Sequence, residues 1–156
     1  MNSNDELLST TATLSAYVLQ NSQSAKDDAE IEPCVIWGHS EQPAGLRILR
    51  IDGGDIYAIL NQVSPVEIPI EADLVGLICP GWASPMSVES SSSHPKRTRV
   101  VVVVVLDLKT GDMTTQIIFM DKREPVVTTE RPAGHLGDAL MSCAARISTH
   151  RKEQLH

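Results

Sequence analysis

The feature that most constrains this chain is an unbroken run of six valines at residues 100–105. Valine loses side-chain rotational freedom in a helix, whereas its branched side chain packs well on a pleated strand. The run therefore predicts a strand over residues 99–108. It is too short to cross a bilayer as a helix, because only seven apolar residues precede Asp107.

A partner strand is expected directly after the valine run. Residues 109–112 read Lys-Thr-Gly-Asp, and Gly111 can adopt the left-handed backbone that a tight turn needs. Residues 113–120 then return as a second apolar segment that ends in Ile-Ile-Phe-Met. The pattern predicts an antiparallel hairpin.

Earlier segments carry further strand signals. Residues 73–79 are nearly all apolar, which indicates a central strand that is buried on both faces and ends at Pro80 and Gly81. Three shorter elements are expected before it: a strand at residues 34–37, and a hairpin of residues 46–51 and 56–60 around an Asp-Gly-Gly-Asp turn.

Helix signals stand at the two ends of the chain. Ser3 and Glu6 fit a capping box, and apolar residues then recur at helical spacing, which predicts a helix over residues 4–20. Pro132 suits the first turn of a second helix, which is expected over residues 133–149.

These elements predict one α+β domain over residues 1–156. Its core is a mostly antiparallel sheet of about five or six strands, with the N- and C-terminal helices packed on it, where both could cover one face. The remaining segments are expected to be a polar linker or loop at 21–32, a loop or an edge segment at 62–70, a long loop at 82–97, a charged segment with Pro125 at 121–131, and a frayed tail at 150–156.

The charge balance limits the classes of molecule that this chain is expected to bind. The chain has 13 Lys and Arg against 20 Asp and Glu, a formal net charge of −7, and 3% aromatic residues. Nucleic acids and anionic membranes are bound by clustered cations, and bases stack on aromatic rings, so neither partner is expected.

The N-terminus has neither a basic segment nor an apolar segment of the kind that makes a secretory signal, so a cytoplasmic location is expected. The three cysteines, Cys34, Cys79 and Cys143, are widely spaced and form no CxxC pair. We interpret them as reduced thiols, and expect neither a metal nor a cofactor.

The candidate site is the segment from Gly81 to Arg99. Trp82 directly follows the expected central strand, where an exposed indole would anchor a partner. Ser93, His94, Arg97 and Arg99, together with Lys96, could hold a phosphate or carboxylate. The alternative interpretation is structural: Trp82 caps the core, and the basic residues protect the start of the valine strand from aggregation.

Two other groups of residues are weaker candidates for a functional site. His39 and His94 could share a metal ion if their strands were neighbours, with Asp107 or Cys34 as a third ligand, although both histidines also fit exposed loops. Residues 131–135 precede a helix, whose N-terminal amides attract anions or are simply capped. A triad drawn from Ser84, His94 and Asp107 has no geometric support in sequence alone.

Part of the chain resembles a pattern in uncharacterised actinobacterial proteins. The shared segments are Gly81-Trp82-Ala83-Ser84-Pro85, then Ser93-His94-Pro95-Lys96-Arg97-Thr98-Arg99, and a valine-rich strand that ends at Asp107 and Gly111. The resemblance covers about residues 73–120. It implies no catalytic residue, but it suggests that Trp82 and His94 belong to one feature.

A fragment of that segment, Ser93-His94-Pro95, is also similar to the His-x-His-Pro loop of the JAMM-type metallo-isopeptidases. Ser92 stands where that family has its first histidine, so one metal ligand of the family pattern is missing here.

Two functional hypotheses follow. The first is a non-enzymatic binding or regulatory module for a protein partner or a small anionic ligand, with its site at residues 81–99. The second is a small hydrolase or transferase for an anionic small molecule, with His94 as general base and Arg97 or Arg99 as anion clamp. A structural subunit of a larger assembly fits as well, and the oligomeric state stays open, a dimer included.

Overall fold

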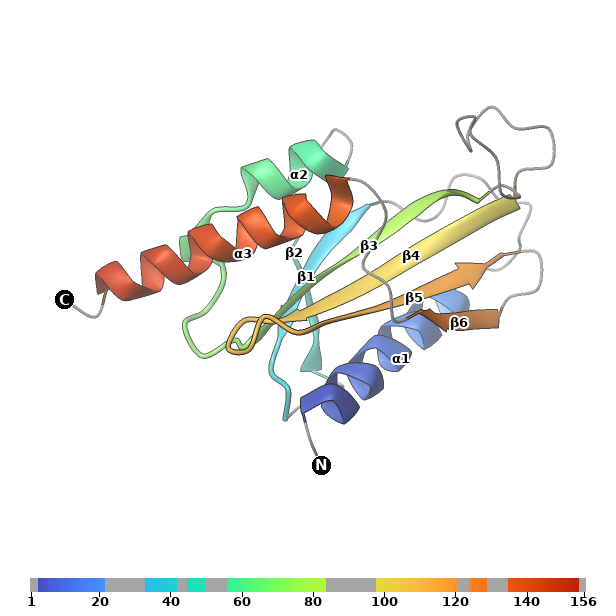
Figure 1. Ribbon diagram of the computed structural model, residues 1–156, viewed down its shortest axis with the longest axis horizontal. Helices are drawn as coiled ribbons and strands as arrows, with labels where there is room; N and C mark the ends of the chain where they lie inside the picture. The colour runs from blue at the N-terminus through green and yellow to red at the C-terminus, as the bar shows by residue number, and fades with distance from the viewer. Residues whose placement is uncertain are drawn as a thin grey trace.

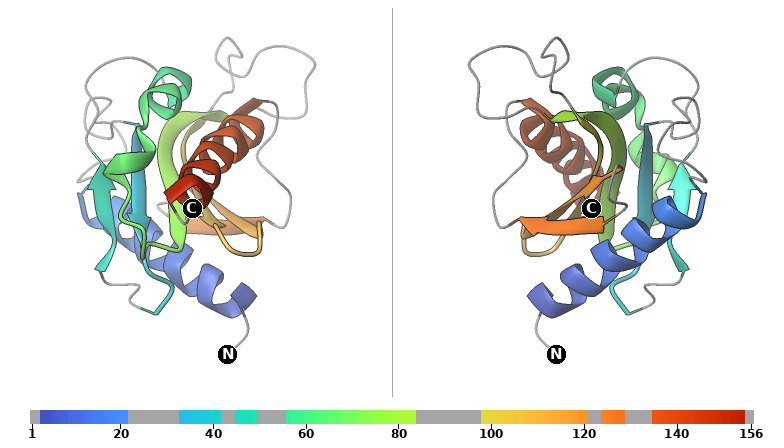
Figure 2. Two further views of the ribbon diagram at one scale, coloured as in Figure 1. Left: turned by 90° about the vertical axis from the view of Figure 1, so that its left-hand side faces the viewer. Right: turned by 90° about the vertical axis from the view of Figure 1, so that its right-hand side faces the viewer.

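The computed structural model describes residues 3–21, 33–41, 45–49, 56–83, 98–120, 124–128 and 135–154. Helix α1 (Ser3–Asn21) lies on one face of an antiparallel six-stranded sheet, and helices α2 (Ile56–Gln62) and α3 (His135–Gln154) lie on the other (Figure 1; Figure 2). The α+β class, the antiparallel sheet and the helix near each end of the chain are confirmed.

The sheet is almost a simple meander. Its order is β2-β1-β3-β4-β5-β6, so only the exchange of β1 and β2 breaks the sequence of the chain. The strands are β1 (Cys34–Gly38), β2 (Arg47–Leu49), β3 (Leu74–Ala83), β4 (Thr98–Asp107), β5 (Met113–Phe119) and β6 (Glu124–Thr128). A 3-10 helix, η2 (Pro65–Glu67), connects α2 to β3.

The valine run forms β4, in the middle of the sheet. It pairs with β3 along ten residues, from Leu74 opposite Asp107 to Ala83 opposite Thr98. On its other side it pairs with β5 through the predicted hairpin, where Gly111 takes the expected left-handed conformation with φ of 78°. Both edges of β4 are therefore paired along most of its length, as its apolar composition indicates.

The core has two halves, one on each side of the sheet. Leu7, Leu14 and Val18 of α1 pack on alternate residues of β3 and β4, among them Val103 and Val105. The opposite half combines α2 and α3 with the intervening positions of the same strands; its most buried members include Leu60, Leu77, Val104, Leu140 and Ile147. The expectation that both terminal helices cover one face is wrong, because each face of β3 and β4 is apolar and needs a helix of its own.

Helix α1 is held by polar contacts as well as apolar ones. The hydroxyl of Thr11 hydrogen-bonds the hydroxyl of Thr114 at 2.5 Å, and that of Ser15 donates to Oε1 of Gln116 at 2.7 Å. Ser15 and Gln116 are both buried, so the contact satisfies polar groups that would otherwise lack partners.

The predicted hairpin over residues 46–60 is wrong. Residues 56–62 form α2, with Ile56, Ile59 and Leu60 buried along one side. This spacing is helical, and burial of the stripe against α3 outweighs the strand preference of isoleucine and tyrosine. The expected turn at residues 52–55 lies outside the described residues.

Two strand predictions also need correction. The central strand does not end at Pro80 and Gly81, since β3 continues to Ala83 and pairs with β4 throughout. Residues 124–128, which lie in the charged segment with Pro125 and were not predicted as a strand, form the edge strand β6. A proline is tolerated on an edge, where one side of the strand needs no donors.

The C-terminal helix is longer than expected. It continues to Gln154, and Arg151, expected in a frayed tail, donates from Nη2 to the carbonyl oxygen of Pro69 at 2.8 Å. In the part of the chain that the structure describes, no helix combines the length and the apolar character that a membrane span requires.

Candidate functional site

The β3–β4 pair has two ends with different surroundings. We call residues 74–78 of β3 and 103–107 of β4 the inner end, and residues 79–83 and 98–102 the outer end. Within the described residues, β1 accompanies β3 only as far as Ile78, which is opposite Cys34. The outer end then continues past α2 and α3, to the right in Figure 1.

The outer end carries the two predicted site residues that the structure places. Trp82 of β3 lies directly opposite Arg99 of β4 in the strand register. Arg99 is half-buried, and its carbonyl oxygen accepts a hydrogen bond from the amide of Met120 at 3.0 Å. Two residues 17 positions apart in sequence are thus brought side by side, at the base of the segment where the site was predicted.

The sheet face that carries Gly81 is apolar, and it is the opposite face from that of Arg99, because successive side chains of a strand alternate. Among the described residues, a β-carbon at Gly81 would meet no atom within 4 Å. The register aligns Gly81 with Val100 and Phe119, and the next row inward contains Cys79, Val102 and Ile117. Val100 is buried, but the other four side chains in these rows are only half-buried. The outer end therefore presents a shallow apolar surface.

Other predicted site residues lie outside the described part of the chain. Ser93, His94 and Arg97 come between β3 and β4 in sequence, outside the described residues, and the side chain of Trp82 is not described either. The hydrolase or transferase hypothesis depends on His94 and stays a prediction. The same holds for the metal site shared by His39 and His94 and for the anion site at residues 131–135.

Asp107, considered as a metal ligand and a triad member, has a structural role instead. Its Oδ1 accepts hydrogen bonds from the amides of Lys109 at 2.8 Å and Thr110 at 3.2 Å, which caps the β4–β5 turn. It lies nine residues along β4 from Thr98, a distance of about 30 Å in a strand. Asp107 therefore belongs to the far end of the strand from the predicted site.

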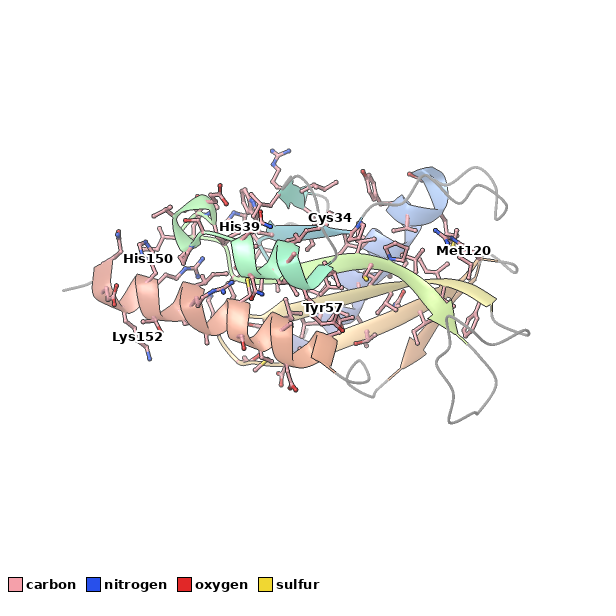
Figure 3. All side chains as sticks on the ribbon, turned by 90° about the horizontal axis from the view of Figure 1, so that it is seen from above. Cys34, His39, Tyr57, Met120, His150 and Lys152 are labelled. Carbon is pink, nitrogen blue, oxygen red and sulfur yellow. The ribbon has the colours of Figure 1, made fainter. Side chains whose placement is uncertain are left out.

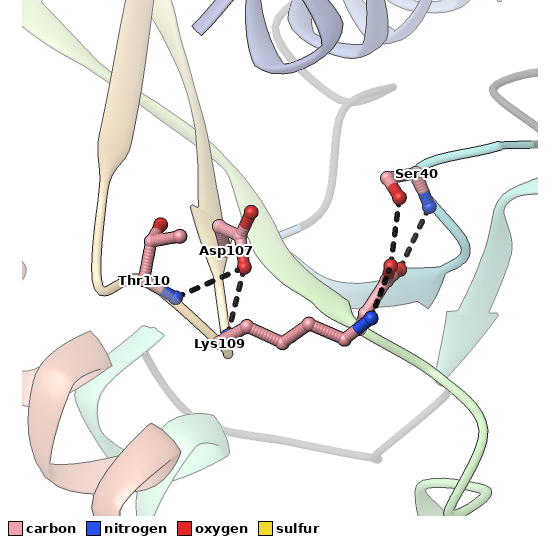
Figure 4. Close-up of polar contacts among 5 residues, drawn as sticks. Ser40, Asp107, Lys109 and Thr110 are labelled. Atoms are coloured by element: carbon pink, nitrogen blue, oxygen red, sulfur yellow. Dashed lines mark hydrogen bonds and ion pairs between the residues drawn. The ribbon is translucent and has the colours of Figure 1, made fainter. Parts of the chain in front are cut away.

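A polar cluster surrounds this inner turn (Figure 4). The carboxylate of Asp73 accepts hydrogen bonds from the amide and the hydroxyl of Ser40, both at 2.7 Å, and lies 3.8 Å from Nζ of Lys109. The contacts tie the end of β1 and the β4–β5 turn to the start of β3. We interpret the cluster as structural, because each polar atom is engaged in closing a turn.

A hollow of about 430 Å³ opens between α3 and η2. Its lining consists of Pro65, Ala145, Arg146, Thr149, His150 and Glu153. Figure 3 shows this side of α3, with His150 labelled near the end of the helix. The hollow was not predicted, although the spacing of Arg146, His150 and Glu153 does place them along one side of a helix.

Two side chains under this region have shifted pKa values. Burial raises the pKa of the Cys143 thiol, and the neighbouring Arg146 opposes the shift only partly. Burial likewise lowers the pKa of Arg151, against the attraction of Glu71 and Asp73. A thiol that resists ionisation is a poor nucleophile, so Cys143 is a core residue rather than a reactive one.

Comparison with known proteins adds no assignment: no family model, no curated protein and no solved structure matches this chain. Within the described ranges, no three His, Cys, Asp or Glu side chains gather as metal ligands would. The outer end and the hollow are therefore interpreted from their own geometry.

Proposed function

We propose that the protein is a non-enzymatic binding module whose partner site lies at the outer end of β3 and β4. The observation that carries this proposal is the open space at Gly81, bordered by half-buried apolar side chains on the same sheet face. Cys79 and Val102 pack against the cluster of α2 and α3 but stay half-buried, so this face is a natural position for a partner side chain, because burying it removes apolar area from water.

The neighbouring charge supports the same interpretation. Trp82 and Arg99 are residue types that dominate the energetics of protein interfaces. They occupy opposite positions at the tip of the strand pair, in the row that alternates with Gly81 and Val100, so the proposed partner reaches around the tip to both faces. We further propose that Ser93, His94 and Arg97 belong to this site, since they lie in the segment that joins these two positions in sequence.

The site can be tested by filling it. The variant Gly81→Val adds a branched side chain where a strand favours one and where no atom is displaced. Binders should first be selected against the wild-type protein from a displayed library of random peptides. Their affinities should then be measured for wild type, Gly81→Val, Trp82→Ala and Arg99→Gln, with Tyr57→Ala as a control on the exposed side of α2.

We expect most independent binders to lose at least about tenfold in affinity for Gly81→Val and Trp82→Ala, with melting temperatures unchanged and Tyr57→Ala neutral. A tenfold loss corresponds to about 1.4 kcal/mol. Unchanged affinities would reject the outer end as the site. A large loss of stability in Trp82→Ala, with Gly81→Val neutral, would instead identify Trp82 as a core residue.

A further inference from the structure

The hollow between α3 and η2 carries a second inference, independent of the proposed site at the outer end. Five of its six lining residues come from a single side of α3, and Pro65 of η2 forms the opposite wall. Arginines of α3 bond the chain on both sides of η2, because Arg146 donates to the carbonyl oxygen of Leu60 in α2 and Arg151 to that of Pro69 after η2. The walls are therefore held in fixed relative positions.

Arg146 is oriented but not neutralised. Its Nη2 bonds a backbone carbonyl at the end of α2, and the described residues place no carboxylate within ion-pair distance of its guanidinium. The nearby Cys143 thiol is held in its neutral form by burial, so it does not offset the charge. Besides its bonds to Leu60 and to the Cys143 thiol, Arg146 has further N–H donors for other partners. A guanidinium that is already oriented loses little entropy when it binds a carboxylate.

The carboxylates near the hollow are directed elsewhere, with one exception. Oε2 of Glu67 accepts from the amide of Ser64 at 3.5 Å, and Glu71 acts on Arg151. Glu153 does line the hollow, but it lies seven residues from Arg146, or about 10 Å along the helix. The hollow thus has a positive end at Arg146 and a negative end at Glu153.

Two exposed apolar residues follow Pro65 of the hollow closely in the chain. Val66, which follows Pro65 in η2, is 71% exposed, and Ile70 is 59% exposed. The tight turn keeps Val66 outside, since the amide of Glu67 bonds the carbonyl oxygen of Ser64 at 2.9 Å. A ligand bound at Arg146 would therefore have apolar surface within reach.

We infer that this hollow binds a short acidic segment of a partner protein, with a carboxylate on Arg146 and an adjacent apolar side chain against Val66 and Ile70. Charge complementarity at the hollow selects this occupant, because the oriented guanidinium of Arg146 matches a carboxylate.

The test uses isotope-labelled full-length protein and a capped heptapeptide, Ser-Gly-Leu-Glu-Leu-Gly-Ser, with a matched peptide that has Gln in place of Glu. Amide chemical shifts report where and how tightly each peptide binds. We expect saturable shifts confined to residues 64–71 and 145–153, and at least about fivefold tighter binding of the Glu peptide, about 1 kcal/mol. Gly81→Val should leave both affinities unchanged.

Glu153 provides the sharper variant, because it makes no contact that the fold needs within the described residues. Glu153→Gln removes the like charge from the lining and should tighten the Glu peptide about twofold to threefold, with no effect on the Gln peptide. Glu41→Gln, an equal charge change at an exposed position that does not line the hollow, should change neither. Arg146→Gln should abolish the preference for Glu over Gln.

Three results would overturn the inference. The first is equal affinity of the two peptides, and the second is no response to Glu153→Gln. The third is a set of shifts at residues 145–153 that depends on protein concentration without peptide, which would mean that a second copy of the chain covers the hollow.

Discussion

The inner and outer ends of the β3–β4 pair belong to the same two strands but have different surroundings. At the inner end, Val75 and Leu77 face α2 and α3, whereas Leu74 and Ile78 face α1, and all four are buried. At the outer end, Cys79 and Val102 are only half-buried on the α3 side. The first half of β3 therefore contributes to the core of the protein, and its second half contributes to an open surface.

The two glycines of β3 express this difference most directly. A β-carbon at Gly76 would lie 2.3 Å from the carbonyl oxygen of Val104, whereas a β-carbon at Gly81 would meet none of the described residues within 4 Å. The first glycine is required by close packing, and the second leaves space unfilled. Similar residues in one strand thus serve stability at one end and remain available for binding at the other.

The largest expected effect is at the inner glycine. Gly76→Val should destabilise the protein by about 3 kcal/mol or more, because its side chain must displace the backbone of β4 as well as Ile36. Chemical denaturation followed by circular dichroism measures this. A loss below 1 kcal/mol would show that the two ends do not differ in packing as the geometry indicates.

Truncation of matched side chains should give the next largest effect. Leu140→Ala removes a fully buried side chain over the inner end and should cost about 3 kcal/mol. Ile117→Ala removes a half-buried one at the outer end and should cost less than half as much, since little cavity forms. Denaturation midpoints compare the two variants, and equal losses would mean that the outer face is covered.

The thiols allow a pH test. Because burial raises the pKa of Cys143 above 9.0, the unfolded chain ionises this thiol at lower pH than the folded chain. The unfolding free energy should therefore be unaffected below pH 8 and fall above pH 9, by up to about 1.4 kcal/mol per pH unit. Cys143→Ala should remove that part of the slope.

In native protein, the half-buried Cys79 should react with a thiol reagent before Cys143 does.

The smallest expected effect is at the outer glycine. Gly81→Val should change the unfolding free energy by less than about 0.5 kcal/mol, or raise it slightly through its strand preference. The comparison with Gly76→Val uses the same substitution in the same strand. If both variants unfold at low denaturant, the space at Gly81 is not open in solution.

The spacing of apolar residues predicted the helices that bury one apolar stripe and the strands that form one apolar run. The valine strand, its hairpin partner and both long helices fall within a few residues of their expected positions. The segment at residues 56–60 was misassigned because five apolar or aromatic residues in a row fit a strand and a helix equally well. These residues form a helix because α3 packs on Ile59 and Leu60 in the folded protein.

The candidate site was predictable in part. Trp82 and Arg99 were identified from their residue types, and the register places them opposite each other. The open space at Gly81 was not predictable, because Pro80 and Gly81 resemble the end of a strand and the length of α3 determines which sheet rows are covered. Arg146 also appeared as an ordinary surface charge, since its partner Leu60 lies 86 residues away.

The hydroxyl contacts of α1 have a consequence for motion. A helix held by aliphatic side chains alone can shift along a sheet through many nearly equivalent positions. Here a slide of one turn, about 5.4 Å, would separate Ser15 from Gln116 and Thr11 from Thr114 while the surrounding face remains buried. Each buried polar group left without a partner costs about 1–3 kcal/mol. Helix α1 therefore has one docked position, and it leaves the sheet as a unit or not at all.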